Sequence, residues 1–214
     1  MASTQNSVEL LLKYFPAITE KQKLQFSAMK SIYEEANARV NLISRKDIDF
    51  LYEKHILHSL SIAKIISFVP STRIMDVGTG GGFPGIPLAV MFPDSQFFLV
   101  DSIKKKCVQV EQIVKALDLK NVKVLNSRVE EIEIKFDFIL SRAVNLMSDF
   151  HRWVKNKFDH KHRNKLKNGI ICLKGGDLAE ELKYFGNKAK IYMLKDFFEE
   201  TFFETKSAVY LPIT

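Results

Sequence analysis

A glycine-rich turn is the feature that most restricts how this chain can fold. Four of the five residues from Gly78 to Gly82 are glycine, and the turn follows an apolar run, Arg73–Val77, that has the composition of a strand. Glycine adopts backbone conformations that a side chain would forbid, and a helix that starts just after such a turn offers unpaired N–H groups to a ligand. The turn is therefore typical of a cofactor-binding loop at one end of a parallel sheet.

The chain after Pro70 alternates between short β-rich runs and helical runs, the pattern of successive β-α-β units. It predicts an α/β fold with a mostly parallel sheet, in which the last two strands, separated only by a loop, pair antiparallel. The expected strands are Arg73–Val77, Gln96–Asp101, Val122–Asn126, Phe136–Ser141, Ile170–Lys174, Lys190–Leu194 and Ala208–Leu211. The expected helices are Ile86–Phe92, Lys104–Leu117, Leu146–Lys157 and Asp177–Phe185, with a weak turn at Val129–Ile132.

The first 70 residues have a different character, because they contain no glycine and show helical periodicity. Apolar residues recur at three- and four-residue steps from Leu24 to Val40, which predicts an amphipathic helix. A second helix is expected from about Tyr52 to Phe68, closed by Pro70. We therefore expect residues 1–70 to form a helical cap on a main domain of residues 71–214.

Composition limits the compartment and the class of partner. The chain has 32 Lys+Arg against 25 Asp+Glu, a net charge of +7, which favours a polyanion such as nucleic acid or an anionic membrane surface. It has two cysteines, Cys107 and Cys172, without a Cys/His cluster, so neither a disulfide framework nor a zinc site is expected. Residues 1–9 lack the features of a secretory signal, and no apolar run is long enough to span a membrane. We expect a cytoplasmic protein.

Acidic residues follow three successive predicted strands. Asp76 stands at the end of the first strand, Asp101 at the end of the second, and Glu130 follows the third. Because the carboxyl ends of adjacent parallel strands meet in one crevice, these acids are expected around one ligand. The glycine spacing over residues 80–85, together with Asp101, also matches the motif that binds a nicotinamide dinucleotide. This motif, however, does not start at the position after the strand where it stands in dinucleotide-binding proteins. A nicotinamide-dependent oxidoreductase thus stays open as an alternative.

The layout of strands, turn and acids resembles the Rossmann-like, seven-stranded class I methyltransferases, which use S-adenosyl-L-methionine and release S-adenosyl-L-homocysteine. Over nearly the whole chain the sequence resembles the glucose-inhibited division protein B family, bacterial enzymes that methylate guanine N7 in 16S ribosomal RNA. At His58–Leu60 the chain has His-Ser-Leu where the family usually has Asp-Ser-Leu. The runs that carry the resemblance are Asn41-Leu42, Glu53–Leu60, Asp76–Pro87, Asp101-Ser102, Ser127–Glu130, Ser141–Ala143 and Leu173–Gly175.

The resemblance implies methylation of a guanosine in 16S rRNA, presented as RNA or as the small ribosomal subunit, by a chain that we expect to be a monomer. Guanine N7 carries an exposed lone pair, so the enzyme needs to align the reactants and needs no general base. Arg142, after the fourth predicted strand, is the residue expected to position substrate or cofactor. The family's cofactor contacts fall on Gly78, Phe83, Val129, Glu130 and Arg142, and the turn and strand ends add Asp76, Thr79, Gly80, Gly82 and Asp101.

A basic segment, Arg152–Lys167, precedes the fifth predicted strand. It has seven Lys/Arg against Asp159 alone, a net charge of +6, and it contains the only tryptophan, Trp153. Basic and aromatic side chains together suit phosphate contact and base stacking, so we expect this segment near the mouth of the crevice or on the adjacent face. A merely solvated basic loop is the alternative. The predicted RNA-binding residues are Arg152, Lys155, Lys161, Arg163, Lys165, Lys167 and, after the fifth strand, Lys174.

Two further points bear on function. His55 and His58 are three residues apart, but no third ligand stands at a metal-site spacing, so no metal is expected. A non-catalytic RNA-binding assembly factor with a relic cofactor pocket is the remaining alternative. The intact Gly78, Gly80 and Asp101 argue against such decay.

Overall fold

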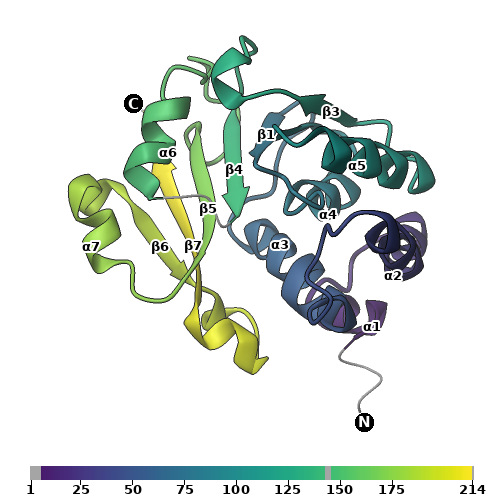
Figure 1. Ribbon diagram of the computed structural model, residues 1–214. Helices are drawn as coiled ribbons and strands as arrows, with labels where there is room; N and C mark the ends of the chain where they lie inside the picture. Colours follow the sequence, from purple (N-terminus) through teal and green to yellow (C-terminus); the bar gives the residue numbers. More distant parts are fainter. Residues whose placement is uncertain (1–5, 143–145, 214) are drawn as a thin grey trace.

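The computed structural model describes residues 6–142 and 146–213. Its centre is a seven-stranded sheet with the order β3-β2-β1-β4-β5-β7-β6, shown in Figure 1. All strand pairs are parallel except those of β7, which runs antiparallel to both β5 and β6. The strands are β1 (Arg73–Val77), β2 (Gln96–Asp101), β3 (Val122–Asn126), β4 (Phe138–Arg142), β5 (Gly169–Gly175), β6 (Lys190–Met193) and β7 (Lys206–Pro212).

The α/β fold, the seven strands and the antiparallel pairing of the last two are confirmed. The first three strands have the predicted bounds, whereas β4 starts two residues later than predicted and continues through Arg142. The strand β7 lies between β5 and β6. The carboxyl ends of β1, β2, β4 and β5 therefore share one edge of the sheet, and their amino ends share the other.

Alternation along the strands produces two hydrophobic cores, one on each face. On β1, for example, Ile74 packs into one core and Met75 into the other, as Phe97 and Phe98 do on β2. Because side chains of a strand point alternately to opposite faces, strands that are apolar at every position must be covered on both sides. This is the physical reason for a three-layer architecture.

Helices form the outer two layers (Figure 1). One core receives side chains from the N-terminal helices and also from α4 (Gly85–Met91) and α5 (Lys104–Ala116). The other core receives side chains from η4 (Val129–Glu131), α6 (Met147–Val154) and α7 (Ala179–Leu182). The chain continues from α7 into η5 (Lys183–Lys188), and η6 (Leu194–Asp196) and η7 (Thr201–Thr205) connect β6 to β7. The predicted helices are thus present, with α6 and α7 shorter than expected.

The N-terminal region begins with α1 (Val8–Tyr14), which the sequence did not reveal, and α2 (Glu20–Arg39), which it did. The buried face of α2 consists of Phe26, Met29, Tyr33 and Ala36. Leu24, expected on that face, is instead 70% exposed. The helical periodicity was correctly recognised, but it did not fix where the buried stripe begins.

The second N-terminal helix is not regular. Its parts are η1 (Ile48–Phe50), a π-helical η2 (Leu51–Leu57), a short α3 (His58–Leu60) and a 3₁₀-helical η3 (Ser61–Lys64). The hydroxyls of Ser59 and Ser61 donate to the carbonyls of His55 and His58, each at 2.6 Å. Such serine bonds compete with the helical ladder and explain why the helix changes type and ends before Phe68.

The N-terminal helices and one face of the sheet form a single hydrophobic core. Residues such as Leu11, Met29 and Ile56 belong to the same cluster as Ile74 and Leu99 of the sheet. The predicted division into two domains, a cap of residues 1–70 and a main domain of residues 71–214, stays a prediction. None of the helices in the described residues has the length and apolarity needed to cross a bilayer.

Candidate functional site

The glycine-rich turn lies at the carboxyl end of β1 and is held by Asp76. This carboxylate is fully buried, and its Oδ2 accepts hydrogen bonds from Thr79 Oγ1 at 2.6 Å and from Gly85 N at 2.9 Å. Its Oδ1 is buried without a partner in the described structure, and burial raises the pKa of Asp76 to about 6. Asp76 therefore orients the turn.

The backbone of the turn has the conformations expected of glycine. Gly78, Gly80 and Gly82 have φ values of 67°, 58° and 88°, the left-handed region that side chains disfavour. A Cβ placed on Gly80 would meet nothing closer than 3.9 Å, so the turn presents an open surface there. Asp101, at the end of β2, accepts from Gly80 N at 2.9 Å and from Ile103 N at 2.9 Å. Two of the three predicted acids, Asp76 and Asp101, thus fix the loop.

Phe83 connects the turn to the N-terminal helices. It is 1% exposed, and its ring lies 4.9 Å from that of Tyr33 and 5.2 Å from that of His55. The Tyr33 hydroxyl donates to Gly81 O at 2.8 Å, which ties α2 directly to the turn. Burial raises the pKa of Tyr33. The cap is therefore part of the wall of the site.

Arg142, the last residue of β4, joins the turn to the N-terminal helices from the other side. Its guanidinium carbon lies 5.0 Å from the centre of the Phe83 ring, and its Nη2 lies 3.1 Å from His55 Nδ1. Its Nη1 donates to Lys54 O at 3.4 Å. Burial lowers the pKa of Arg142 to about 10, so the group is still protonated at neutral pH. Arg142 is a cation held at a defined place.

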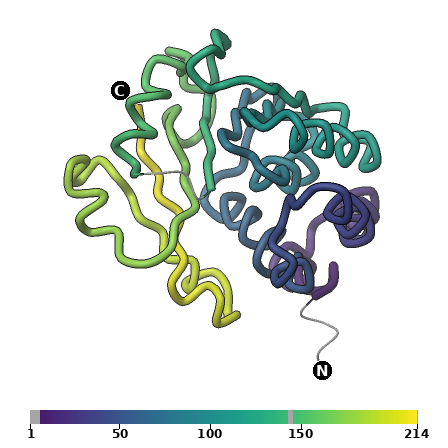
Figure 2. The backbone as a smooth tube through the Cα atoms, viewed as in Figure 1, coloured from purple at the N-terminus to yellow at the C-terminus, as the bar shows by residue number. Residues whose placement is uncertain are grey.

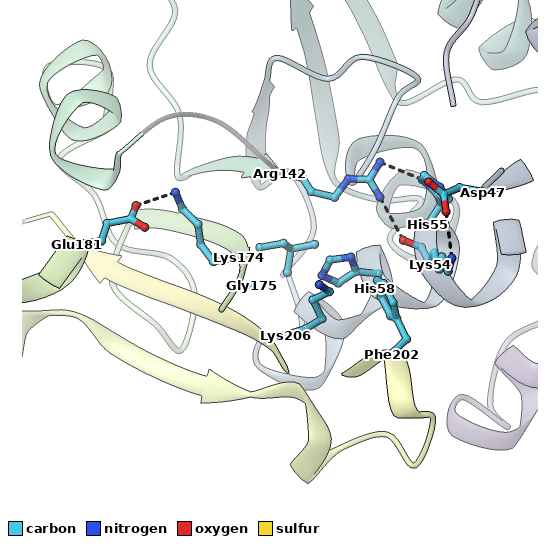
Figure 3. A pocket seen from close by; sticks show the side chains of 11 residues that line it. Asp47, Lys54, His55, His58, Arg142, Lys174, Gly175, Glu181, Phe202 and Lys206 are labelled. Carbon is cyan, nitrogen blue, oxygen red and sulfur yellow. Dashed lines mark hydrogen bonds and ion pairs between the residues drawn. The ribbon is translucent and has the colours of Figure 1, made fainter. Parts of the chain in front are cut away.

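Arg142 also lines a pocket of about 700 Å³ at the carboxyl ends of β4 and β5, shown in Figure 3. The N-terminal region forms one side, and Phe202 of η7 and Lys206 of β7 form another. The glycine turn does not line it, so the turn and the pocket are neighbouring spaces with Arg142 and Phe83 between them. The lining residues are Asp47, Lys54, His55, His58, Arg142, Leu173, Lys174, Gly175, Glu181, Phe202 and Lys206.

Four basic and two acidic residues line this pocket. Asp47 accepts from Lys54 at 3.0 Å, and Glu181 accepts from Lys174 at 2.7 Å and from Met147 N at 2.7 Å. Both acids are thus neutralised. In the described residues no carboxylate pairs with Arg142, and the pocket therefore has a positive character suited to an electron-rich base or a phosphate.

The pocket also contains two buried histidines. His55 and His58 each have a pKa lowered to about 3, first by burial and then by the charge of Arg142. Both rings are therefore neutral at physiological pH. The Nε2 atoms of both are buried without a partner in the described structure.

Two other predicted cofactor residues, Val129 and Glu130, follow β3 and do not line the pocket of Arg142. Val129 is buried in the hydrophobic core opposite the N-terminal helices. Glu130 is exposed and lines a separate pocket of about 530 Å³ that includes Trp153 and Lys157. The structure brings neither to the pocket lined by Arg142. Their predicted contact with the cofactor stays a prediction.

Of the two places expected for the basic segment Arg152–Lys167, the mouth of the crevice is wrong for the loop that enters β5. The part that connects α6 to β5 reaches the amino end of β5, as the backbone trace shows (Figure 2). The pocket lies at the carboxyl ends of β4 and β5. Asp159 pairs with Arg73 at the first residue of β1, at 2.8 Å, and Asn164 accepts from Val69 N at 2.9 Å. Sheet topology explains the error, since a chain that enters a parallel strand must first return to its amino end.

Individual cations of this segment differ in what they contact. Lys157 donates to the Glu130 and Ile132 carbonyls, and Arg152 pairs with Asp149. The side chains that are exposed with no ion pair in the described structure are Lys155, Lys161, Arg163, Lys165 and Lys167. This set forms a basic surface at the amino-end edge of the sheet.

Sequence reasoning missed several residues of the pocket. Asp47 and Glu181 come from two distant segments and Phe202 and Lys206 from a third, and nothing in their local sequence marks them. Lys54 and His55 lie inside a run that carried the family resemblance, which was the one available signal. In the described residues no group of three His, Cys, Asp or Glu could hold a metal ion.

Comparison with known proteins identifies relatives of this chain. Residues 22–208 match the sequence model of the GidB family, described as rRNA small subunit methyltransferase G. The chain is 55% identical to ribosomal RNA small subunit methyltransferase G of Flavobacterium johnsoniae, covering 95% of this chain and 97% of the relative. It is 54% identical to the protein of the same name from Christiangramia forsetii, with coverages of 97% and 98%.

A solved structure supports the fold. A SAM-dependent methyltransferase from Aquifex aeolicus has a TM-score of 0.53 and 16% identity, covering 86% of this chain and 97% of that one. The sequence-based prediction of a Rossmann-like class I fold is confirmed, and the oxidoreductase alternative is set aside by the family match. The chain belongs to the GidB family, rRNA small subunit methyltransferase G, and is an S-adenosyl-L-methionine-dependent rRNA methyltransferase.

Proposed function

We propose that the pocket at the ends of β4 and β5 receives the target guanosine of 16S rRNA and that its N7 takes the methyl group of S-adenosyl-L-methionine. The observation that carries this proposal is the position of Arg142. Its guanidinium contacts Phe83 of the glycine turn and at the same time lines the 700 Å³ pocket. A cofactor at the turn and a base in the pocket would therefore meet at Arg142.

The residues around the turn fit S-adenosyl-L-methionine. Three glycines at positive φ and the open surface above Gly80 permit close approach of a ligand to the backbone. Asp101 and Asp76 already hold the loop in this shape, which favours binding because little ordering is needed. Gly78, Gly80 and Phe83 would contact the cofactor, whose sulfonium supplies an electrophilic methyl group when bound.

The chemistry requires alignment and no proton transfer before methylation, because guanine N7 has a free lone pair. Arg142 is suited to donate a hydrogen bond to the guanine O6 alone, which fixes the base and leaves the lone pair of the neighbouring N7 free for the methyl group. The neutral His55 accepts from Arg142 and holds it in place. Positioning of this kind is worth about 7–11 kcal/mol of the barrier in well-oriented reactions.

We further propose that the basic surface at the amino-end edge contacts the RNA backbone away from the reaction. Lys161, Arg163 and Lys165 are exposed on one short loop. Such cations bind phosphates without reading sequence. Because this edge is opposite the pocket, a substrate that touches both must be an extended or folded RNA, which favours the small ribosomal subunit over a short strand.

Two further expectations belong to the same proposal. The substrate is cytoplasmic, so we propose that the protein acts in the cytoplasm, and we propose that it acts as a monomer because one chain supplies both the turn and the pocket. Sedimentation of the purified protein at micromolar concentration tests the second point. A dimer at that concentration would contradict it.

The test of the proposed function is methyl transfer to a mapped nucleotide. Small subunits from cells that lack the protein are incubated with labelled S-adenosyl-L-methionine and the purified chain, and the modified position is located. We expect N7-methylguanosine at one site. Arg142→Ala should lower the rate at least 100-fold, whereas Arg39→Ala, an exposed arginine of α2 paired with Glu35, should not. Tight S-adenosyl-L-homocysteine binding without incorporation would instead support the relic assembly factor.

A further inference from the structure

His58 is a buried side chain with one ring nitrogen that is unpaired in the described residues. Its side chain is 6% exposed, and the edges of the Phe202 and Phe203 rings enclose it at centroid distances of 5.3 and 6.1 Å. Its Nε2 has no hydrogen-bond partner in the described structure. An unsatisfied buried nitrogen costs stability, and such groups in native proteins call for a functional explanation. His58 lines the 700 Å³ pocket, so its partner is expected to come from a ligand.

The protonation of His58 determines what that partner must be. The ring is neutral at physiological pH, since Arg142 and Lys206 both disfavour its protonated form after burial has done so. A neutral ring carries one proton, and the cations Arg142 and Lys206 in the same pocket disfavour an N–H directed at them. The proton is therefore favoured on Nδ1, and the unpaired Nε2 has the lone pair. His58 offers the pocket a hydrogen-bond acceptor.

The groups that line the pocket with His58 Nε2 are mainly hydrogen-bond donors. Arg142 and Lys206 also line the pocket, and the carboxylates of Asp47 and Glu181 are already bonded to Lys54 and Lys174. His55 differs from His58, because its Nδ1 accepts from Arg142 and its own Nε2 must carry the proton. Among the histidines of the pocket, His58 is thus the acceptor.

Guanine matches this arrangement and adenine does not. Guanine presents acceptors at O6 and N7 and donors at N1–H and the 2-amino group, whereas adenine has a donor at N6 and a lone pair at N1. Resting on the proposed function, we propose that His58 Nε2 accepts a hydrogen bond from the N1–H or 2-amino edge of the target guanine and so selects guanine over adenine. Figure 3 shows His58 between Arg142 and Lys206, which places this acceptor next to the cations suited to O6.

Variants of His58 test this role. His58→Phe keeps the ring shape but removes the acceptor, and His58→Asn keeps an acceptor. His58→Phe should lower kcat/KM for the guanosine substrate about 10- to 100-fold, with the Kd for S-adenosyl-L-homocysteine unchanged, and His58→Asn should restore part of the loss. The matched control is His151→Phe, since His151 of α6 also contacts a phenylalanine edge-on, Phe185 at 5.5 Å, outside the pocket. We expect wild-type rates for it.

A substrate series makes the test independent of how the variants fold. The wild-type enzyme is given RNA with inosine, which lacks the 2-amino group, or N1-methylguanosine, which lacks N1–H, at the target position. At least one should react about 10-fold more slowly or worse, and that penalty should shrink in His58→Phe. Full activity on both analogues, or an unchanged preference for guanosine over adenosine in His58→Phe, overturns the proposal for His58 alone. No incorporation by the wild type on any substrate overturns the proposed function with it.

Discussion

At the scale of single residues, the conformation of Gly78 controls the cofactor site. Its φ of 67° lies in a region that β-branched residues avoid. Gly78→Val should therefore weaken binding of S-adenosyl-L-homocysteine at least 10-fold, through backbone strain and through a side chain placed at the turn. Isothermal titration measures this. An unchanged Kd would show that the turn does not bind the cofactor.

The buried His58 should make stability depend on pH. Its pKa is about 3 in the folded chain, against 6.5 in the unfolded one, so only the unfolded state takes up the proton between these values. The free energy of unfolding should thus decrease as pH falls from about 6.5 toward 3, by about 1.4 kcal/mol per pH unit for this group. The stability is fully present above pH 6.5.

The measurement is denaturant unfolding of wild type and His58→Phe at several pH values. Asp76 acts in the opposite sense, because its pKa is raised to about 6 and its stabilising contribution is lost as pH rises from 3.8 through 6. Comparison of the two proteins cancels that effect. Between pH 6 and 4, the free energy of unfolding should change less steeply with pH in His58→Phe than in wild type, by the equivalent of about one proton taken up on unfolding. Equal slopes in the two proteins would contradict the burial of His58 as a neutral ring.

At the scale of elements, sequence patterns predicted strands better than helices. Strands such as β1 and β2 are apolar at consecutive positions and bounded by turns, and their bounds were correct. One helix was predicted from about Tyr52 to Phe68, but the segment from Leu51 to Lys64 is divided into π, α and 3₁₀ parts, with the hydroxyls of Ser59 and Ser61 bonded to backbone carbonyls. Periodicity carries no information about such side-chain bonds.

The position of the basic loop before β5 follows from the strand that it enters. Replacing Lys161, Arg163 and Lys165 with Ala should reduce the log–log salt dependence of RNA binding by about 2 to 3 units, since three phosphate contacts would be lost. Filter binding between 50 and 200 mM salt measures this. The matched control is a variant in which three exposed lysines near β6, Lys188, Lys190 and Lys195, are replaced with Ala. Equal slopes in wild type and the loop variant would show that the loop is only solvated and makes no phosphate contacts.

At the scale of the whole molecule, the N-terminal helices and the sheet should unfold together. They share one hydrophobic core, and Tyr33 of α2 is bonded to Gly81 of the turn. We expect a single thermal transition, with the same midpoint by circular dichroism and by fluorescence of Trp153, which lies on the opposite face of the sheet in α6. Two separate transitions would instead support an independent cap of residues 1–70.

Local patterns in the sequence were enough to predict the α/β class, the seven strands and the glycine turn with Asp76 and Asp101, because these features depend on residues close together in the chain. The family followed from short runs spread over much of the chain. The tertiary structure was needed to see which residues surround the pocket. His58, Glu181 and Lys206 come from distant segments and meet at the ends of β4 and β5. It also placed the basic loop on the opposite edge, since strand direction, and not distance along the chain, decides which end of a parallel sheet a loop occupies.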